Sequence, residues 1–269
     1  MSRFLRVTAC VTSILAAAPI PAFAQNADAL ARQLSNPIAS LTSVPMQLNW
    51  DTDLGSDGEG ECVTLNVQPV IPVSISEEWN MISRTIVPIV SQWDVIPGPD
   101  NQFGLGDTVQ SLFFSPKALT AGGWTWGVGP VFLLPTATDD LLGTEKWGAG
   151  PTGVALKQTT TGWTYGVLVN HLWSFAGESD RRDVNATYLQ PFLAKSLGQG
   201  RTLSFALEST KDWETDQWTV PFNMGFSQVT RIGTQLVSYQ AGVRYYLEAP
   251  DNGPQWGLRF TFTLLYPRR

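Results

Sequence analysis

The stretch GGWTWGVGPVFLLP, residues 122–135, alternates between large apolar side chains and very small ones. From residue 124 on, its even positions carry tryptophan, valine, proline, phenylalanine and leucine, whereas its odd positions carry glycine and threonine as far as residue 129. Successive side chains of a β-strand point to opposite faces, with a period of two. The pattern therefore predicts a strand with one broad apolar face and one nearly empty face.

The same period recurs along most of the chain. Residues 62–74 are apolar at odd positions, and residues 216–229 and 254–267 are apolar at even positions. A tilted strand that crosses a bilayer needs about 9–11 residues, and most of the predicted strands have 10–14. We expect twelve strands, near 45–51, 62–74, 79–91, 107–116, 122–135, 147–157, 162–174, 185–196, 202–210, 216–229, 235–247 and 254–267. Which face points inward is ambiguous for 79–91, 107–116, 147–157 and 185–196.

The connections between these strands are of two kinds. One set is longer and acidic, as in DLGSDGEGE (53–61) and GESDRRD (177–183). The connections of the other set, which alternate with these along the chain, are short. Short turns on one side and longer loops on the other are typical of bacterial outer-membrane barrels. We therefore predict an all-β fold, a transmembrane antiparallel β-barrel whose apolar face meets lipid. A secreted β-sandwich is the alternative, but its outward face should be charged.

Composition narrows the class of protein further. Only 15% of the residues are charged, against about 25% in an average protein, and the chain has 11 tryptophans. Mean hydropathy is −0.03, and after the first two dozen residues no apolar run approaches the roughly 18 residues of a membrane helix. The net charge of −6 argues against nucleic acid as a partner.

The first residues predict an export signal. Arg3 and Arg6 precede a short apolar stretch and the small-residue sequence AFA at 22–24, so we expect a signal peptide over 1–24. Its removal would take Cys10 and leave Cys62 as the one cysteine. Residues 25–44 are expected to form a short helix (27–35) and a tether (36–44). The segment 25–44 as a whole is either a plug at the periplasmic mouth or a disordered tether. The barrel would then occupy 45–269.

The interior face is the candidate functional site. Alternation places charged and amide side chains on it, and opposed charges in a lumen can form a constriction that selects solutes. A structural ion-pair network that closes the lumen is an equal alternative. The predicted pore-lining residues are Arg84, Glu208, Arg244, Arg259, Asn66, Gln68, Asn170, Asn223 and Gln240.

Three other motifs favour no chemistry of their own. GAGPTG (148–153) matches a nucleotide-binding pattern but is not followed by a helix start. His171 and Ser174 would face opposite sides of one strand, which does not suit a hydrolase. We therefore expect no enzyme activity and no cofactor. The acidic loop is a weak candidate for a calcium site, and a solvated loop without metal is the default interpretation. The candidate ligands are Asp51, Asp53, Asp57, Glu59 and Glu61.

Several longer segments resemble one bacterial family. NVQPVIP (66–72), WNMISRTIVPIV (79–90), FGLGDTVQSLFFSP (103–116) and 127–158 are similar to the outer-membrane family labelled "MetA-pathway of phenol degradation", often named transporter. The family is akin to fatty-acid and aromatic-hydrocarbon channels, and SNPIASL (35–41) is similar to the Asn-Pro-Ala segment of their plug. The resemblance implies a plug role for Asn36 and Pro37, although Ile38 interrupts the motif, and it implies uptake of aromatic compounds.

The sequence thus predicts a channel of the bacterial outer membrane that passes small hydrophobic or aromatic solutes passively. The alternative is a closed structural or adhesive barrel whose acidic loops bind partners or divalent ions. The expected partners are outer-membrane lipid and lipopolysaccharide, a small-molecule solute, and the barrel-assembly machinery. The chain ends in LLYPRR, which places the aromatic assembly signal at Tyr266 rather than at the last residue.

Overall fold

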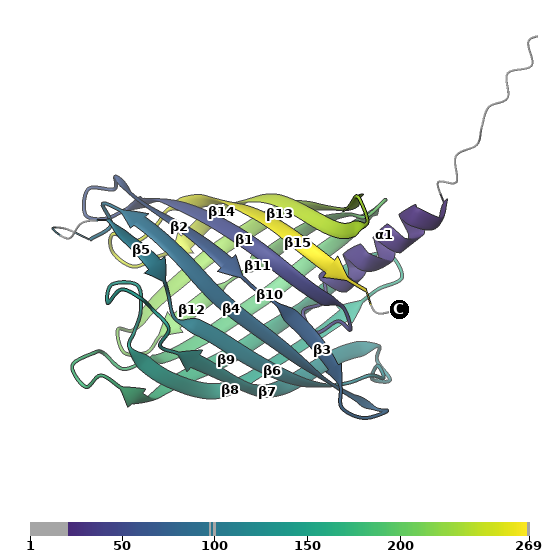
Figure 1. Cartoon of the computed structure of the whole chain (residues 1–269), viewed down its shortest axis with the longest axis horizontal. Helices are drawn as coiled ribbons and strands as arrows, with labels where there is room; N and C mark the ends of the chain where they lie inside the picture. The colour runs from purple at the N-terminus through teal and green to yellow at the C-terminus, as the bar shows by residue number, and fades with distance from the viewer. Residues whose placement is uncertain (1–20, 97, 99–100, 268–269) are drawn as a thin grey trace, which may run out of the picture.

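The alternating segments pair into a single antiparallel sheet that closes on itself (Figure 1). The structure, a computed structural model, describes residues 21–96, 98 and 101–267. Twelve strands form the barrel, as predicted, and one helix precedes it in the described part of the chain. Three of the twelve strands are each built from two segments, namely β2 with β3, β5 with β6, and β11 with β12.

The elements have the following bounds: α1 (Pro21–Leu34), β1 (Thr42–Leu54), β2 (Gly60–Val67), β3 (Val70–Ser74), β4 (Trp79–Trp93), β5 (Gln102–Leu105), β6 (Thr108–Pro116), β7 (Trp124–Leu134), β8 (Lys146–Gln158), β9 (Trp163–Gly177), β10 (Asn185–Gly198), β11 (Arg201–Leu207), β12 (Ser209–Asp212), β13 (Gln217–Ile232), β14 (Gln235–Glu248) and β15 (Trp256–Tyr266). Most strands extend a few residues beyond the predicted limits. The predicted connection 92–106 contains β5, which was not expected from the alternation.

The barrel closes between its first and last strands. Eleven consecutive residues of β1 and β15 pair in register, from Thr42 opposite Tyr266 to Thr52 opposite Trp256. This closure leaves no sheet edge, which matters because an unpaired backbone N–H or C=O in hydrocarbon costs several kcal/mol. Proline residues lie at or opposite two of the strand interruptions. Pro69 separates β2 from β3, and the carbonyl of Pro221 accepts a hydrogen bond from the Glu208 N–H between β11 and β12 (3.1 Å).

The outer surface of the barrel is apolar. Val128 is 51% exposed, Phe226 and Phe260 are each 46% exposed, and the predicted outward faces of 62–74, 122–135, 216–229 and 254–267 all point outward. The four ambiguous strands now have definite faces. Even-numbered residues of β4, β8 and β10 point inward, as do odd-numbered residues of β6, among them Ile82, Phe113, Leu156 and Ala194. Arg84 therefore faces the lumen.

The two ends of the barrel differ, as the connections predicted. One end, here called the turn end, has short turns such as 199–200 and 233–234, and the other, the loop end, has longer connections such as 135–145 and 178–184. Lys146, the first residue of β8, binds Asp183 in the 178–184 connection (3.1 Å), and this hydrogen-bonded pair lowers the pKa of the Asp183 carboxyl below its usual value. In bacterial barrels the short turns face the periplasm.

Helix α1 lies at the turn end (Figure 1). It begins at Pro21, six residues before the predicted start, and its apolar side packs on the barrel through Ala27, Leu30 and Ala31 against Val229 and Leu265. The predicted signal peptide falls largely on residues 1–20, outside the described residues, and remains a prediction. No helix among the described residues has the length and hydropathy to cross a bilayer.

The segment after α1 turns into the barrel. Asn36 accepts a hydrogen bond from the Ile38 N–H (3.0 Å), and Ile38, only 4% exposed, packs in a cluster of inward-facing side chains from β4, β6, β8 and β9. Gly127 belongs to the nearly empty face predicted for 122–135. A Cβ atom at that position would lie 3.2 Å from the Ile38 Cδ1 atom, so the missing side chain leaves room for Ile38. Residues 35–41 thus occupy the turn-end mouth of the barrel.

A closed barrel with an apolar outer surface is the architecture that spans bacterial outer membranes. The chain is therefore a protein of the bacterial outer membrane.

Adjacent residues near the middle of β9 test this assignment. Val169 is exposed on the outer surface, whereas Asn170 faces the lumen. We expect Val169→Lys to lower the free energy of unfolding by about 2–4 kcal/mol, because lysine is costly near the bilayer midplane. Asn170→Lys should lower it much less. Urea unfolding in lipid vesicles, followed by tryptophan fluorescence, measures both, and equal losses would contradict the assignment.

Candidate functional site

The nine predicted pore residues all lie on the walls of cavities inside the barrel. One cavity, of about 290 Å³, lies toward α1 and is called the turn-side cavity. The other, of about 440 Å³, lies toward the loop end and is called the loop-side cavity. Asn223 and Gln240 line the first, Asn66, Asn170 and Arg244 line the second, and Gln68, Arg84, Glu208 and Arg259 line both. Whether these residues select solutes stays a prediction.

A band of polar side chains marks the boundary between the two cavities. Six residues border both of them, and we call this set the collar. They come from the arc of the wall that runs from β10 through β15 to β4. Its members are Gln47, Gln68, Arg84, Gln190, Glu208 and Arg259.

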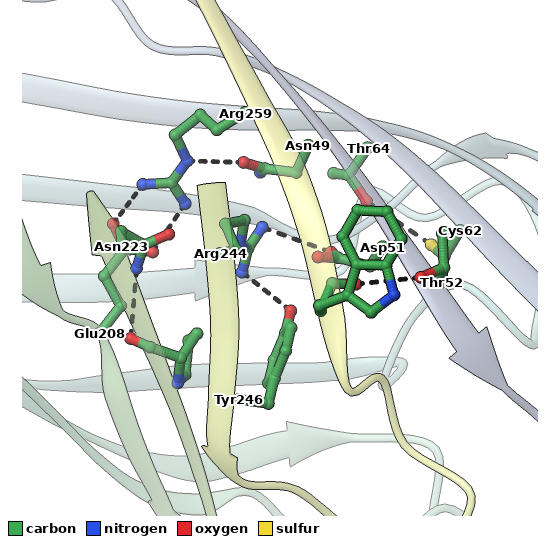
Figure 2. Close-up of polar contacts among 12 residues, drawn as sticks. Asn49, Asp51, Thr52, Cys62, Thr64, Glu208, Asn223, Arg244, Tyr246 and Arg259 are labelled. Carbon is green, nitrogen blue, oxygen red and sulfur yellow. Dashed lines mark hydrogen bonds and ion pairs between the residues drawn. The ribbon is translucent and has the colours of Figure 1, made fainter. Parts of the chain in front are cut away.

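Arg259 and Glu208 form the strongest contact of the collar (Figure 2). The two terminal nitrogens of Arg259 donate to the two carboxylate oxygens of Glu208, at 2.7 and 2.8 Å. The Arg259 Nε atom donates to Asn49, its cross-strand neighbour on β1, at 2.7 Å. A bidentate guanidinium–carboxylate pair fixes both side chains in direction as well as distance. It therefore joins β15 to the junction of β11 and β12, which are not its neighbours in the sheet.

A second ion pair lies on the loop side of the collar. Arg244 Nη1 donates to Asp51 at 3.3 Å and Arg244 Nη2 donates to the Tyr246 hydroxyl at 2.9 Å (Figure 2). Gly257 lies between Arg244 and Asp51 in the sheet, paired with both. A Cβ atom at 257 would come within 2.4 Å of the Asp51 Oδ1 atom, so glycine is what lets the pair meet across β15.

Arg84 differs from the other two lumen arginines. Its Nη2 atom donates to the Gln68 amide oxygen, at 3.3 Å. Among the described residues no carboxylate lies within ion-pairing distance of its guanidinium. Among the described residues, the walls of the two cavities carry three arginines and one carboxylate, Glu208, and a second carboxylate, Asp51, pairs with Arg244 behind the wall.

The structure corrects the interpretation of Asp51. This residue was expected to belong to the acidic loop as a calcium ligand, but its side chain faces the lumen and binds Arg244. Glu61 instead accepts a hydrogen bond from Trp50 Nε1 (3.1 Å). In the part of the chain that the structure describes, no group of three or more histidine, cysteine or acidic residues is arranged to hold a metal ion. Period-two alternation could have found Asp51, because Asn49 shares its face.

Other lumen residues were not predicted from the sequence. Gln47 shares the face of Asn49, and Gln190 lies on a strand whose facing was ambiguous. Ile38 was treated as a departure from a plug motif, yet it is the apolar contact that seats this segment. No local signal marks it, because its partners are spread over several strands.

The remaining motifs have structural roles. GAGPTG lies inside β8, where a Cβ atom at Gly150 would be 1.8 Å from the His171 carbonyl oxygen, so close backbone approach requires glycine there. His171 Nδ1 and the Thr187 hydroxyl are 2.7 Å apart, whereas Ser174 donates to Asp183. His171 and Ser174 therefore do not form a catalytic pair.

One comparison with a solved structure supports the fold, and two others are weaker. The chain is similar to the structure of a COG4313 outer membrane channel from Pseudomonas putida F1, with a TM-score of 0.66 at 13% sequence identity. The match covers 84% of this chain and 96% of the Pseudomonas chain. The β domain of the Bordetella autotransporter BrkA scores 0.44 at 8% identity, covering 84% of this chain and 100% of its own. The translocator domain of the Neisseria meningitidis autotransporter NalP also scores 0.44, at 13% identity and with 91% and 94% coverage.

No protein-family model matches the chain, and no curated protein does. The phenol-degradation family label therefore stays a prediction. The Pseudomonas channel agrees with the fold derived above, that of an outer-membrane β-barrel.

The Glu208–Arg259 pair can be tested by a double-mutant cycle. We expect Glu208→Gln to destabilise the barrel by about 3 kcal/mol, because it leaves a guanidinium unpaired inside the wall. Arg259→Met together with Glu208→Gln should recover most of that loss. Urea unfolding in vesicles gives the four free energies. Additive losses would mean that the two side chains do not stabilise each other.

Proposed function

We propose that this chain is an outer-membrane channel that passes small hydrophobic or aromatic solutes passively, with the collar as its constriction. The observation that carries the proposal is the pair of internal cavities that share one polar band of the wall. A barrel of twelve strands encloses more space than the side-chain-filled barrels of eight strands. The similar Pseudomonas protein is an outer membrane channel, which supports the same function here.

The lining suits solutes that are not fully polar. Ile86, Val109, Leu168 and Leu172 line the loop-side cavity together with amide side chains. Small-molecule sites are mostly apolar with a few polar groups that fix orientation, and volumes of about 300–1,000 Å³ are usual. A cavity of about 440 Å³ fits a single-ring compound better than a large lipid.

Transport can be measured directly with the purified chain in liposomes. We expect benzyl alcohol and benzamide to equilibrate across these vesicles faster than across vesicles without protein. The control is the same chain heated and left unfolded in the lipid, identified by its altered gel mobility. Equal rates with folded chain and with empty vesicles would remove the channel function.

Residues 35–41, which lie in the turn-end mouth, should limit the rate of solute passage. We expect Ile38→Ala to raise solute passage several-fold, because the substitution removes apolar contacts worth about 2–5 kcal/mol and the segment leaves the mouth more often. Ile75→Ala is the matched control, since Ile75 is 50% exposed in a turn outside the lumen. An unchanged rate for Ile38→Ala would show that residues 35–41 do not block the path.

A closed structural or adhesive barrel is the second candidate. It is favoured by the seated Ile38 and by the two ion pairs, which together can fill the lumen. Single-channel recordings distinguish the two functions. Absence of conductance from both the wild-type chain and Ile38→Ala, in a correctly folded barrel, would support the closed barrel.

A further inference from the structure

The charges of the collar and its neighbours do not balance. Arg259 and Arg244 are each matched by a carboxylate, at 2.7 and 3.3 Å, whereas Arg84 binds only the neutral Gln68 side chain among the described residues. The lumen wall thus carries one positive charge in excess at this level. A guanidinium in a partly desolvated site gains from an anion, because the desolvation of its charge is then compensated.

Arg84 lies where a passing solute must go. It borders the turn-side cavity, the loop-side cavity and a third, small cavity beside Pro37 and Leu41. Glu208 lies in the same collar and is already bound on both oxygens by Arg259. Arg84 is therefore the collar cation with donors free for a ligand, and Gln68 and Gln190 place amide groups on the same cavity walls.

The space next to Arg84 determines the rest of the ligand. Ile86, two residues further along the inward face of β4, and Val109 and Leu168 line the loop-side cavity beside it. Tyr188, also on that wall, adds an aromatic surface. A ligand held there would carry one anionic group at the collar and an apolar ring or short chain above it. A single excess positive charge matches a monoanion, and the fork of donors on arginine matches a carboxylate.

We propose that Arg84 binds the carboxylate of a small monocarboxylate whose aromatic or short aliphatic body occupies the loop-side cavity. This inference rests on the channel function proposed above and names the class of solute that the collar prefers. The neutral solutes of the same size lack this contact and cross without a preferred site.

Binding of two near-isosteric probes, benzoate and benzamide, tests the inference with the full chain folded in detergent. Isothermal titration should give the wild-type chain an affinity for benzoate at least about tenfold higher than for benzamide, as expected for a charge-assisted bidentate contact. Arg84→Gln should bring that ratio close to one. Arg84→Lys should give an intermediate ratio, because lysine keeps the charge but loses the fork.

Arg201→Gln is the matched control. Arg201 is exposed at the turn end, where it binds Gln228, and its replacement changes the net charge by the same amount. The benzoate-to-benzamide ratio should stay at the wild-type value in this variant. Heat-dependent gel mobility identifies any variant that fails to fold. A wild-type ratio near one overturns the inference whatever the variants do.

The two proposals fail in different ways. Benzamide that crosses liposomes with the wild-type chain, combined with a ratio near one, leaves the channel function standing and removes the Arg84 site. A high ratio that depends on Arg84, combined with no passage of either probe, keeps the site and removes the channel function.

Discussion

Backbone pairing in hydrocarbon is the constraint on which this structure depends. Water cannot satisfy the N–H and C=O groups within the bilayer, so the sheet must close, and β1 pairs with β15 over eleven residues. Between the bulges, the pairing fixes the facing of each strand residue by its parity. Side chains that point outward must then be apolar, whereas those that point inward are free to carry charge. The lumen can hold charged side chains because backbone hydrogen bonding closes the sheet around it.

Register then decides which inward charges meet. Asn49 and Arg259 are opposite each other on neighbouring strands, and their side chains bond directly. Arg244 and Asp51 are separated by a whole strand, and they meet because Gly257 between them has no side chain. Both arginines are thereby held by rigid strands rather than by loops. A collar built in this way keeps its geometry while the loops at the barrel end vary.

Parity made much of this predictable from the sequence. It indicated the twelve strands and the inward facing of Arg259 and Asn223, and it could have indicated Asp51. It did not resolve β4, β6, β8 and β10, and the structure shows why. Ile82, Phe113 and Leu156 point inward on the first three of these strands, and Phe192 on the fourth packs on the same cluster. An apolar segment inside the barrel makes the inner face apolar as well, so the alternation that identifies the outer face is lost.

The loss of alternation in these four strands also indicates which half of the lumen is apolar. Four adjacent strands, β13, β14, β15 and β1, line the polar half of the lumen with Asn49, Asn223, Gln240 and Arg259. The strands whose facing was ambiguous, β4, β6, β8 and β10, contribute inward apolar side chains to the other half, where Ile38 is seated. The lumen is therefore two-sided, and Arg84 extends from the apolar half into the polar collar. A wholly polar solute would leave the apolar wall without a partner, and a wholly apolar one would leave the collar unsolvated. Two-sidedness of this kind favours a solute that is itself apolar at one end and polar at the other.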